Sequence, residues 1–133
     1  MAAKILITLA TLLYAVAPLI ADLNDSHVLH PEWPPHARVH MVWLLAVNHL
    51  VAWVALYLLW VRSEVVLAAV LGLCVYGGFW ISALTRNSYG GAYTDEGGVD
   101  ITIMGFDANA FTFSVALAVL LLGLFLHLRK KAP

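Results

Sequence analysis

Histidines and carboxylates are concentrated in residues 22–40, the stretch that follows the first apolar segment of the chain. This stretch carries three carboxylates, three prolines, one arginine and four histidines, which are His27, His30, His36 and His40. Because prolines fix φ and stiffen the backbone, we expect a shaped loop rather than a loose tether. Pro34 and Pro35 suit the first turn of a helix. On that helix His36 and His40, spaced i and i+4, share one face.

Two kinds of chemistry fit these residues. Two imidazoles on one helix face can hold one divalent metal ion, with His27 and His30 as further ligands. A histidine and a carboxylate at the mouth of an apolar bundle can instead exchange protons with a lipophilic substrate. The candidate groups for that second role are Asp22, His36, His40 and Glu32. The same groups could also only cap helix ends and bond the loop backbone, so the sequence leaves these alternatives open.

Polar side chains within an apolar span usually face the bundle interior, where they find a partner. Asn48 and His49 lie deep in the second apolar stretch, and Tyr76 lies in the third. We expect them to line a ligand pocket together with Trp33 and Trp43. The alternative for the two tryptophans is a place in the aromatic belt at the membrane surface.

The composition indicates the class of protein that carries these groups. The chain has 133 residues, of which 62% are hydrophobic and 11% are charged. Soluble domains have about 25% charged residues, and a chain this short could not bury so much apolar surface. The net charge of −1 gives no reason to expect a nucleic-acid partner, and a single cysteine, Cys74, excludes a disulfide scaffold. The chain is therefore predicted to be an integral membrane protein.

Four apolar stretches are long enough to cross a bilayer core of about 30 Å as helices. They cover residues 5–21, 41–61, 65–84 and 110–128. The tight turn Arg62–Glu64 makes the second and third spans antiparallel neighbours. The predicted fold is therefore all-α, a single up-down bundle of four transmembrane helices.

The basic residues that flank the spans predict the orientation. Five of the seven lysines and arginines fall at one end of the bundle, and only Arg38 and Arg86 fall at the other. Because cytoplasmic loops are enriched in Lys and Arg, we expect both termini in the cytoplasm. The two long loops, 22–40 and 85–109, would then be periplasmic, with the protein in a bacterial inner membrane.

The second long loop is expected to form a small outer β-hairpin or lid. Residues 92–94 and 100–103 could pair across a glycine-containing turn at 95–98. Asp107 or Asn109 is expected to cap the last helix.

The chain resembles the small four-helix membrane proteins of the EXPERA and DoxX-like kind. The resemblance lies in Asp22-Leu23 after the first span, Pro31-Glu32-Trp33 before the second, and the basic tail Arg129-Lys130-Lys131. The loop from His30 to His40 is also similar to that of an uncharacterised bacterial family of small membrane proteins. The EXPERA resemblance implies a pocket for a lipophilic ligand between the helices, with Asp22 as its acid. This chain has no glutamate in the second span, so His40, Asn48 or His49 would take that place.

These observations predict a membrane protein that binds a lipophilic small molecule in a pocket within the bundle, open to the outer face. It could carry out acid–base chemistry such as isomerisation. The alternatives are a membrane enzyme or binding protein with a divalent metal, and a non-catalytic subunit of a larger membrane complex. Expected partners are membrane lipids, the lipophilic molecule, and a second copy or a larger complex. Haem is not expected, because His49 and His127, the candidate axial ligands, lie at different depths.

Overall fold

The computed structural model describes residues 1–25, 27–93 and 101–130. Four long helices dominate it: α1 (Ala2–Asp22), α2 (Pro35–Trp60), α3 (Val65–Thr85) and α4 (Ala108–Arg129). Each is long and apolar enough to cross a membrane. The predicted all-α fold with four membrane-spanning helices is therefore confirmed. The second helix begins at Pro35, earlier than the apolar stretch itself, because the two prolines set its first turn.

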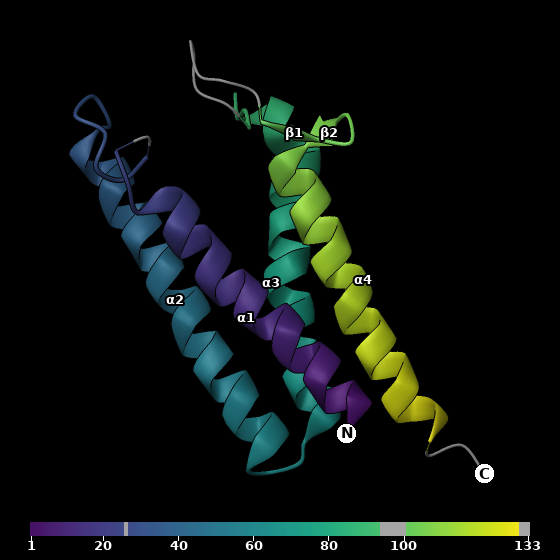
Figure 1. Cartoon of the computed structure of the whole chain (residues 1–133). Coiled ribbons are helices and arrows are strands. Elements are labelled where there is room, and N and C mark those ends of the chain that lie inside the picture. Colours follow the sequence, from purple (N-terminus) through teal and green to yellow (C-terminus); the bar gives the residue numbers. More distant parts are fainter. Residues whose placement is uncertain (26, 94–100, 131–133) are drawn as a thin grey trace.

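The helices run up and down, so that both termini lie at the same end of the bundle as the α2–α3 turn (Figure 1). We call this the terminal end, and the end that carries residues 23–25, 27–34, 86–93 and 101–107 the loop end. The helices α1 and α3 touch each other and both remaining helices, whereas α2 and α4 share no contact. The helices α1 and α3 therefore meet across one diagonal of the bundle, and α2 and α4 lie on opposite sides of this diagonal contact.

The contact between α1 and α3 is built from aromatic and small side chains. Tyr14 and Tyr76 are fully buried and meet edge to face, with ring centroids 5.7 Å apart. The Tyr76 hydroxyl donates a hydrogen bond of 2.6 Å to the carbonyl oxygen of Ala10. Gly72 lies beside Tyr14 and leaves space for Leu120 of α4. These contacts hold the three helices α1, α3 and α4 together at the middle of the bundle.

A second close contact lies nearer the terminal end, where α1 crosses α4. A Cβ atom on Gly123 would lie 2.9 Å from the Ile7 side chain and 3.1 Å from the Ala3 carbonyl oxygen. Small residues at such crossings let backbones approach each other, which is the main source of helix affinity inside a bilayer. From this crossing α1 leans away from α4 toward the loop end (Figure 1).

The small hairpin is present, but its strands differ from the predicted ones. β1 (Thr102–Ile103) pairs antiparallel with β2 (Phe106–Asp107). The two residues between them, Met104 and Gly105, both have positive φ, which suits a tight two-residue hairpin turn. The predicted partner strand was wrong, since residues 92–93 are not in a strand. Residues 94–100, which include the predicted turn, lie outside the described residues.

Asp107 caps α4, as predicted. Its side-chain oxygen accepts hydrogen bonds from the backbone N–H groups of Asn109 (2.9 Å) and Ala110 (3.0 Å). The cap directly follows β2, so the hairpin and the start of α4 form one continuous unit.

Gly123→Ala should destabilise the bundle by about 1–3 kcal/mol, because the added methyl group meets backbone and cannot be accommodated by a side-chain rotation. Gly78→Ala is the matched control, since a Cβ atom there meets nothing within 4 Å. The measurement is reversible unfolding in mixed micelles. Equal stability of the two variants would contradict the close α1–α4 crossing.

The two central tyrosines allow a second comparison. Tyr76→Phe should lower the free energy of unfolding by about 1 kcal/mol, because it removes the hydrogen bond to Ala10. The Tyr14 hydroxyl is buried, with no hydrogen-bond partner within the described residues. Tyr14→Phe should therefore leave the stability unchanged or raise it. The same unfolding assay tests both, and a larger loss for Tyr14→Phe would be the contrary result.

Candidate functional site

His36 and His40 come together at the start of α2, as their spacing predicts. Their Nε2 atoms are 2.9 Å apart, and the ring centroids are separated by 4.4 Å with the planes nearly perpendicular. Both side chains are exposed. The ring of Trp43, one turn further on, lies 6.0 Å from that of His40. We call His36 and His40 the histidine pair.

Arg38, on the same helical turn, serves the loop rather than the histidine pair. Its guanidinium donates hydrogen bonds to the carbonyl oxygens of His30, Pro31 (3.1 Å) and Trp33 (3.2 Å). Trp33 also donates from its backbone N–H to His30. One cationic side chain thus holds the proline-rich turn against the start of α2.

Asp22 ends α1 next to the other half of the loop. Its carbonyl oxygen accepts a hydrogen bond from the backbone N–H of Val28, which is buried beneath the loop. The side chain of Asp22 is half-buried and lies close enough to His27 for their charges to interact. The His27 ring in turn meets Trp33 edge to face, with centroids 5.8 Å apart. Asp22 therefore belongs with His27 and not with the histidine pair.

The four loop histidines do not converge on one metal site. The described residues contain no group of three or more His, Cys, Asp or Glu side chains that could hold a metal ion. The Nδ1 atom of His30 lies 3.3 Å from the backbone N–H of Glu32, which donates to it. Of the predicted ligand set, only His36 and His40 come within bonding distance of a common point.

The predicted pocket walls lie in separate places. Tyr76 is fully buried between α1 and α3, and Trp43 is 63% exposed on the outside of α2. His49 and Asn48 are half-buried on α2, where the His49 Nδ1 atom pairs with the Leu45 carbonyl oxygen at 2.9 Å. The structure therefore does not bring these residues into one cavity.

The bundle instead has an apolar groove between α1 and α4, with a volume of about 630 Å³. Ten aliphatic residues line it: Leu9, Ala10, Leu12, Leu13, Val16, Ala17, Ile20, Val115, Ala116 and Val119. Its α1 and α4 residues lie on the loop side of the Gly123 crossing, and the ribbons of α1 and α4 diverge toward the loop end (Figure 1). We call it the α1–α4 groove. The sequence gives little signal for it, because its residues have the same types as ordinary lipid-facing ones.

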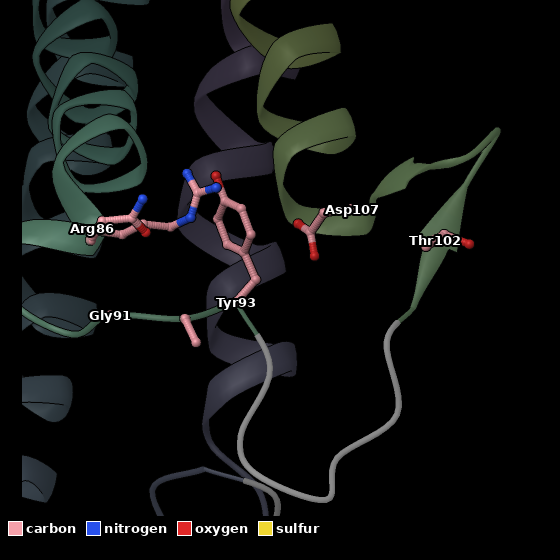
Figure 2. A pocket seen from close by; sticks show the side chains of 7 residues that line it. Arg86, Gly91, Tyr93, Thr102 and Asp107 are labelled. Atoms are coloured by element: carbon pink, nitrogen blue, oxygen red, sulfur yellow. The ribbon is translucent and has the colours of Figure 1, made fainter.

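A second cavity, of about 480 Å³, lies at the loop end between the end of α3 and the start of α4. Figure 2 shows Arg86 against the ring of Tyr93, with Asp107 and Thr102 on the far side. The Arg86 guanidinium lies 5.0 Å from the Tyr93 ring centroid and donates to the Ala83 carbonyl oxygen. Arg86 and Asp107 therefore already make contacts within the protein. Arg86 is one of the two basic residues at the loop end. This scarcity of basic residues is the feature of the sequence that could have pointed to Arg86.

Rings connect this cavity to the bundle core. Tyr93 stacks on Phe79, and Phe79 stacks on Phe113 with centroids 4.1 Å apart. Phe113 meets Tyr76 edge to face. The residues that shape the loop end of α3 and α4 are thus packed continuously onto the core.

The comparison with known families assigns the chain. It belongs to DUF6640, a family of unknown function, whose model matches residues 6–132. No curated protein matches the chain, and no solved structure does. The match covers α2, α3 and α4 and, from residue 6 onward, α1 of this DUF6640 protein, but it carries no activity with it. The EXPERA and DoxX-like resemblance stays a prediction.

Arg38→Ala should loosen the proline-rich turn, because three carbonyl oxygens lose a charged donor. We expect the loop amides, such as those of Leu29 and Trp33, to exchange with deuterium about tenfold faster, equivalent to about 1.4 kcal/mol of local stability. Hydrogen-exchange mass spectrometry measures this. Arg62→Ala, in the exposed turn at the opposite end, is the control and should leave these amides unchanged. Unaltered exchange in Arg38→Ala would show that the turn does not need the guanidinium.

Proposed function

We propose that this DUF6640 protein binds a lipophilic molecule from the bilayer, with one hydrocarbon chain lying in the α1–α4 groove. The observation that carries the proposal is the groove itself: about 630 Å³, within the membrane-spanning helices, with only aliphatic side chains on its walls. Pockets for small molecules commonly have volumes of about 300–1,000 Å³ and are mostly apolar.

The dimensions of the groove fit a single chain. Its α1 wall extends from Leu9 to Ile20, which is about 16 Å along a helix that rises 1.5 Å per residue. This is close to half of a hydrocarbon core of about 30 Å. A chain from the leaflet at the loop end would therefore be covered along most of its length.

The same dimensions argue against a helix of a partner protein. Spread over about 16 Å, the volume corresponds to a cross-section of about 40 Å², which is about 7 Å across. A helix with its side chains is about 10 Å wide or more. A second copy of the chain could cover the groove but not fill it. A flexible hydrocarbon chain, which reaches the groove sideways from the bilayer, fits it better.

The predicted acid Asp22 does not share a helix face with the α1–α4 groove. Asp22 follows Ile20 by two residues, which is about 200° around the helix, and its side chain lies close to His27. The histidine pair lies on α2, which contributes no residue to the groove. The proposed function is therefore the binding of a lipophilic molecule, with no acid–base step assigned to Asp22, His27 or the histidine pair.

We also infer the orientation from the basic residues. The terminal end carries Lys4, Arg62 and the Arg129–Lys130 pair, so it faces the cytoplasm. In a bacterial inner membrane the loop end then faces the periplasm.

Val16→Trp tests the groove by filling it. Val16 is 44% exposed and lines the groove, so a larger side chain is tolerated but occupies the space of the ligand. The probe is a phospholipid with a photoactivatable diazirine on one palmitoyl chain, added to the protein in liposomes. Labelling of groove residues, mapped by mass spectrometry, should saturate as the probe fraction rises. In Val16→Trp the apparent affinity should fall about tenfold, the effect of losing contacts to about two methylene groups.

Val54→Trp is the matched control, since Val54 is 51% exposed on α2 and does not line the groove. It should leave the labelling of groove residues unchanged. Labelling that rises linearly at the groove, as for ordinary surrounding lipids, contradicts the proposal. A crosslink that joins two copies of the chain at groove residues would also contradict the proposal.

A further inference from the structure

The histidine pair lies in the aqueous part of the molecule, on a rigid element. The helix α2 has 26 residues, which is about 39 Å, longer than a hydrocarbon core of about 30 Å. Its first turns, which hold His36 and His40, come before the apolar stretch that starts at residue 41, so the excess length is placed at this end of the helix. Pro34 and Pro35 fix where the helix begins, and Arg38 ties this start to the loop. The two imidazoles are both exposed and held one helical turn apart.

The distance within the pair suits two ligands of one metal ion. Imidazole nitrogens bind such ions at about 2.0–2.1 Å. Two of them are then about 2.9 Å apart at a nitrogen–metal–nitrogen angle of 90°, and about 3.3 Å apart at the tetrahedral angle. The Nε2 atoms of His36 and His40 are 2.9 Å apart because one ring is hydrogen-bonded to the other, so the two nitrogens can reach a common ion but this distance does not select the coordination angle. Square or tetragonal coordination by nitrogen and oxygen is typical of Cu²⁺ and Ni²⁺.

We propose that His36 and His40 form a two-imidazole site that binds a divalent transition-metal ion, Cu²⁺ above all, from the aqueous phase at the loop end. Cu²⁺ is also the tightest-binding of the divalent first-row ions at a given nitrogen site. The remaining coordination positions face solvent and are filled by water. The site shares no residue with the α1–α4 groove, so the test of this site is independent of the test of the proposed function.

Binding of a metal ion to the histidine pair neither releases nor takes up a proton. In the free pair one neutral imidazole donates its Nε2–H to the Nε2 lone pair of the other. When the ion binds, the donor changes to its Nδ1–H tautomer, and both exposed rings turn their Nε2 lone pairs to the metal. Two N–metal bonds replace one hydrogen bond and two metal-bound waters, and each ring keeps one proton.

Titration of the untagged, full-length protein with CuCl₂ tests the site. Binding is followed by electron paramagnetic resonance, which reports nitrogen ligands, and by quenching of tryptophan fluorescence, since Trp43 lies 6.0 Å from His40. We expect one Cu²⁺ per chain with two imidazole nitrogens. His36→Ala and His40→Ala should each weaken binding about tenfold or more, because the second ligand acts at high effective concentration. Trp43→Phe should remove most of the quenching but not the paramagnetic signal.

Two control variants separate this site from general histidine binding. His30→Ala removes a loop histidine that lies outside the pair and should bind Cu²⁺ as the native protein does. Combining His40→Ala with Met41→His keeps the histidine count but moves the second imidazole about 100° around the helix, and it should bind as weakly as His40→Ala alone. Circular dichroism confirms that each variant is folded.

Three results would overturn the proposal. One is Cu²⁺ binding that is unchanged in both alanine variants. Another is a loss in His30→Ala as large as that in His36→Ala. The third is tighter binding of Zn²⁺ than of Cu²⁺, which would contradict the affinity order expected at a site of two imidazoles.

Discussion

The diagonal contact between α1 and α3 determines the rest of the architecture. Inside a bilayer, apolar side chains gain little by leaving lipid for protein, so helices associate through close packing and hydrogen bonds. This contact has both, in the edge-to-face rings of Tyr14 and Tyr76 and in the hydrogen bond from Tyr76 to Ala10. Because the diagonal is closed, α2 and α4 cannot touch. The two cavities described above lie between α1 and α4 and at the loop end of α3 and α4, beside this diagonal.

This arrangement explains why the chemically active residues do not converge. The histidine pair and His49 lie on α2, on one side of the diagonal, while the α1–α4 groove lies on the other. Asp22 ends α1, which also forms one wall of the groove, but neither Asp22 nor His27 is among the groove-lining residues. The loop end is likewise divided: Arg38 organises the turn above α1 and α2, and Arg86 packs on Tyr93 beside α3 and α4. Each half of the bundle thus has its own polar surface.

The sequence predicted what depends on local pattern and missed what depends on packing. Span length, the i and i+4 spacing of His36 and His40, and the Asp107 cap follow from the chain alone, and the structure agrees with all three. The rotation of each helix about its axis does not follow from hydropathy when nearly every residue is apolar. Gly78 and Gly123 look equivalent in sequence, yet one meets open space and the other touches α1. The predicted pocket walls depended on that rotation.

The groove and the histidine pair also differ in how far composition could reveal them. Concavity, not residue type, separates Val16 in the groove from Val54 on the surface of α2, so no reading of the sequence distinguishes them. The histidine pair is the opposite case, since helical geometry fixes its spacing once Pro34 and Pro35 have set the start of α2. A binding site for a hydrocarbon chain therefore requires the three-dimensional structure for its discovery. A site for a metal ion on a single helix requires only that the helix be correctly placed.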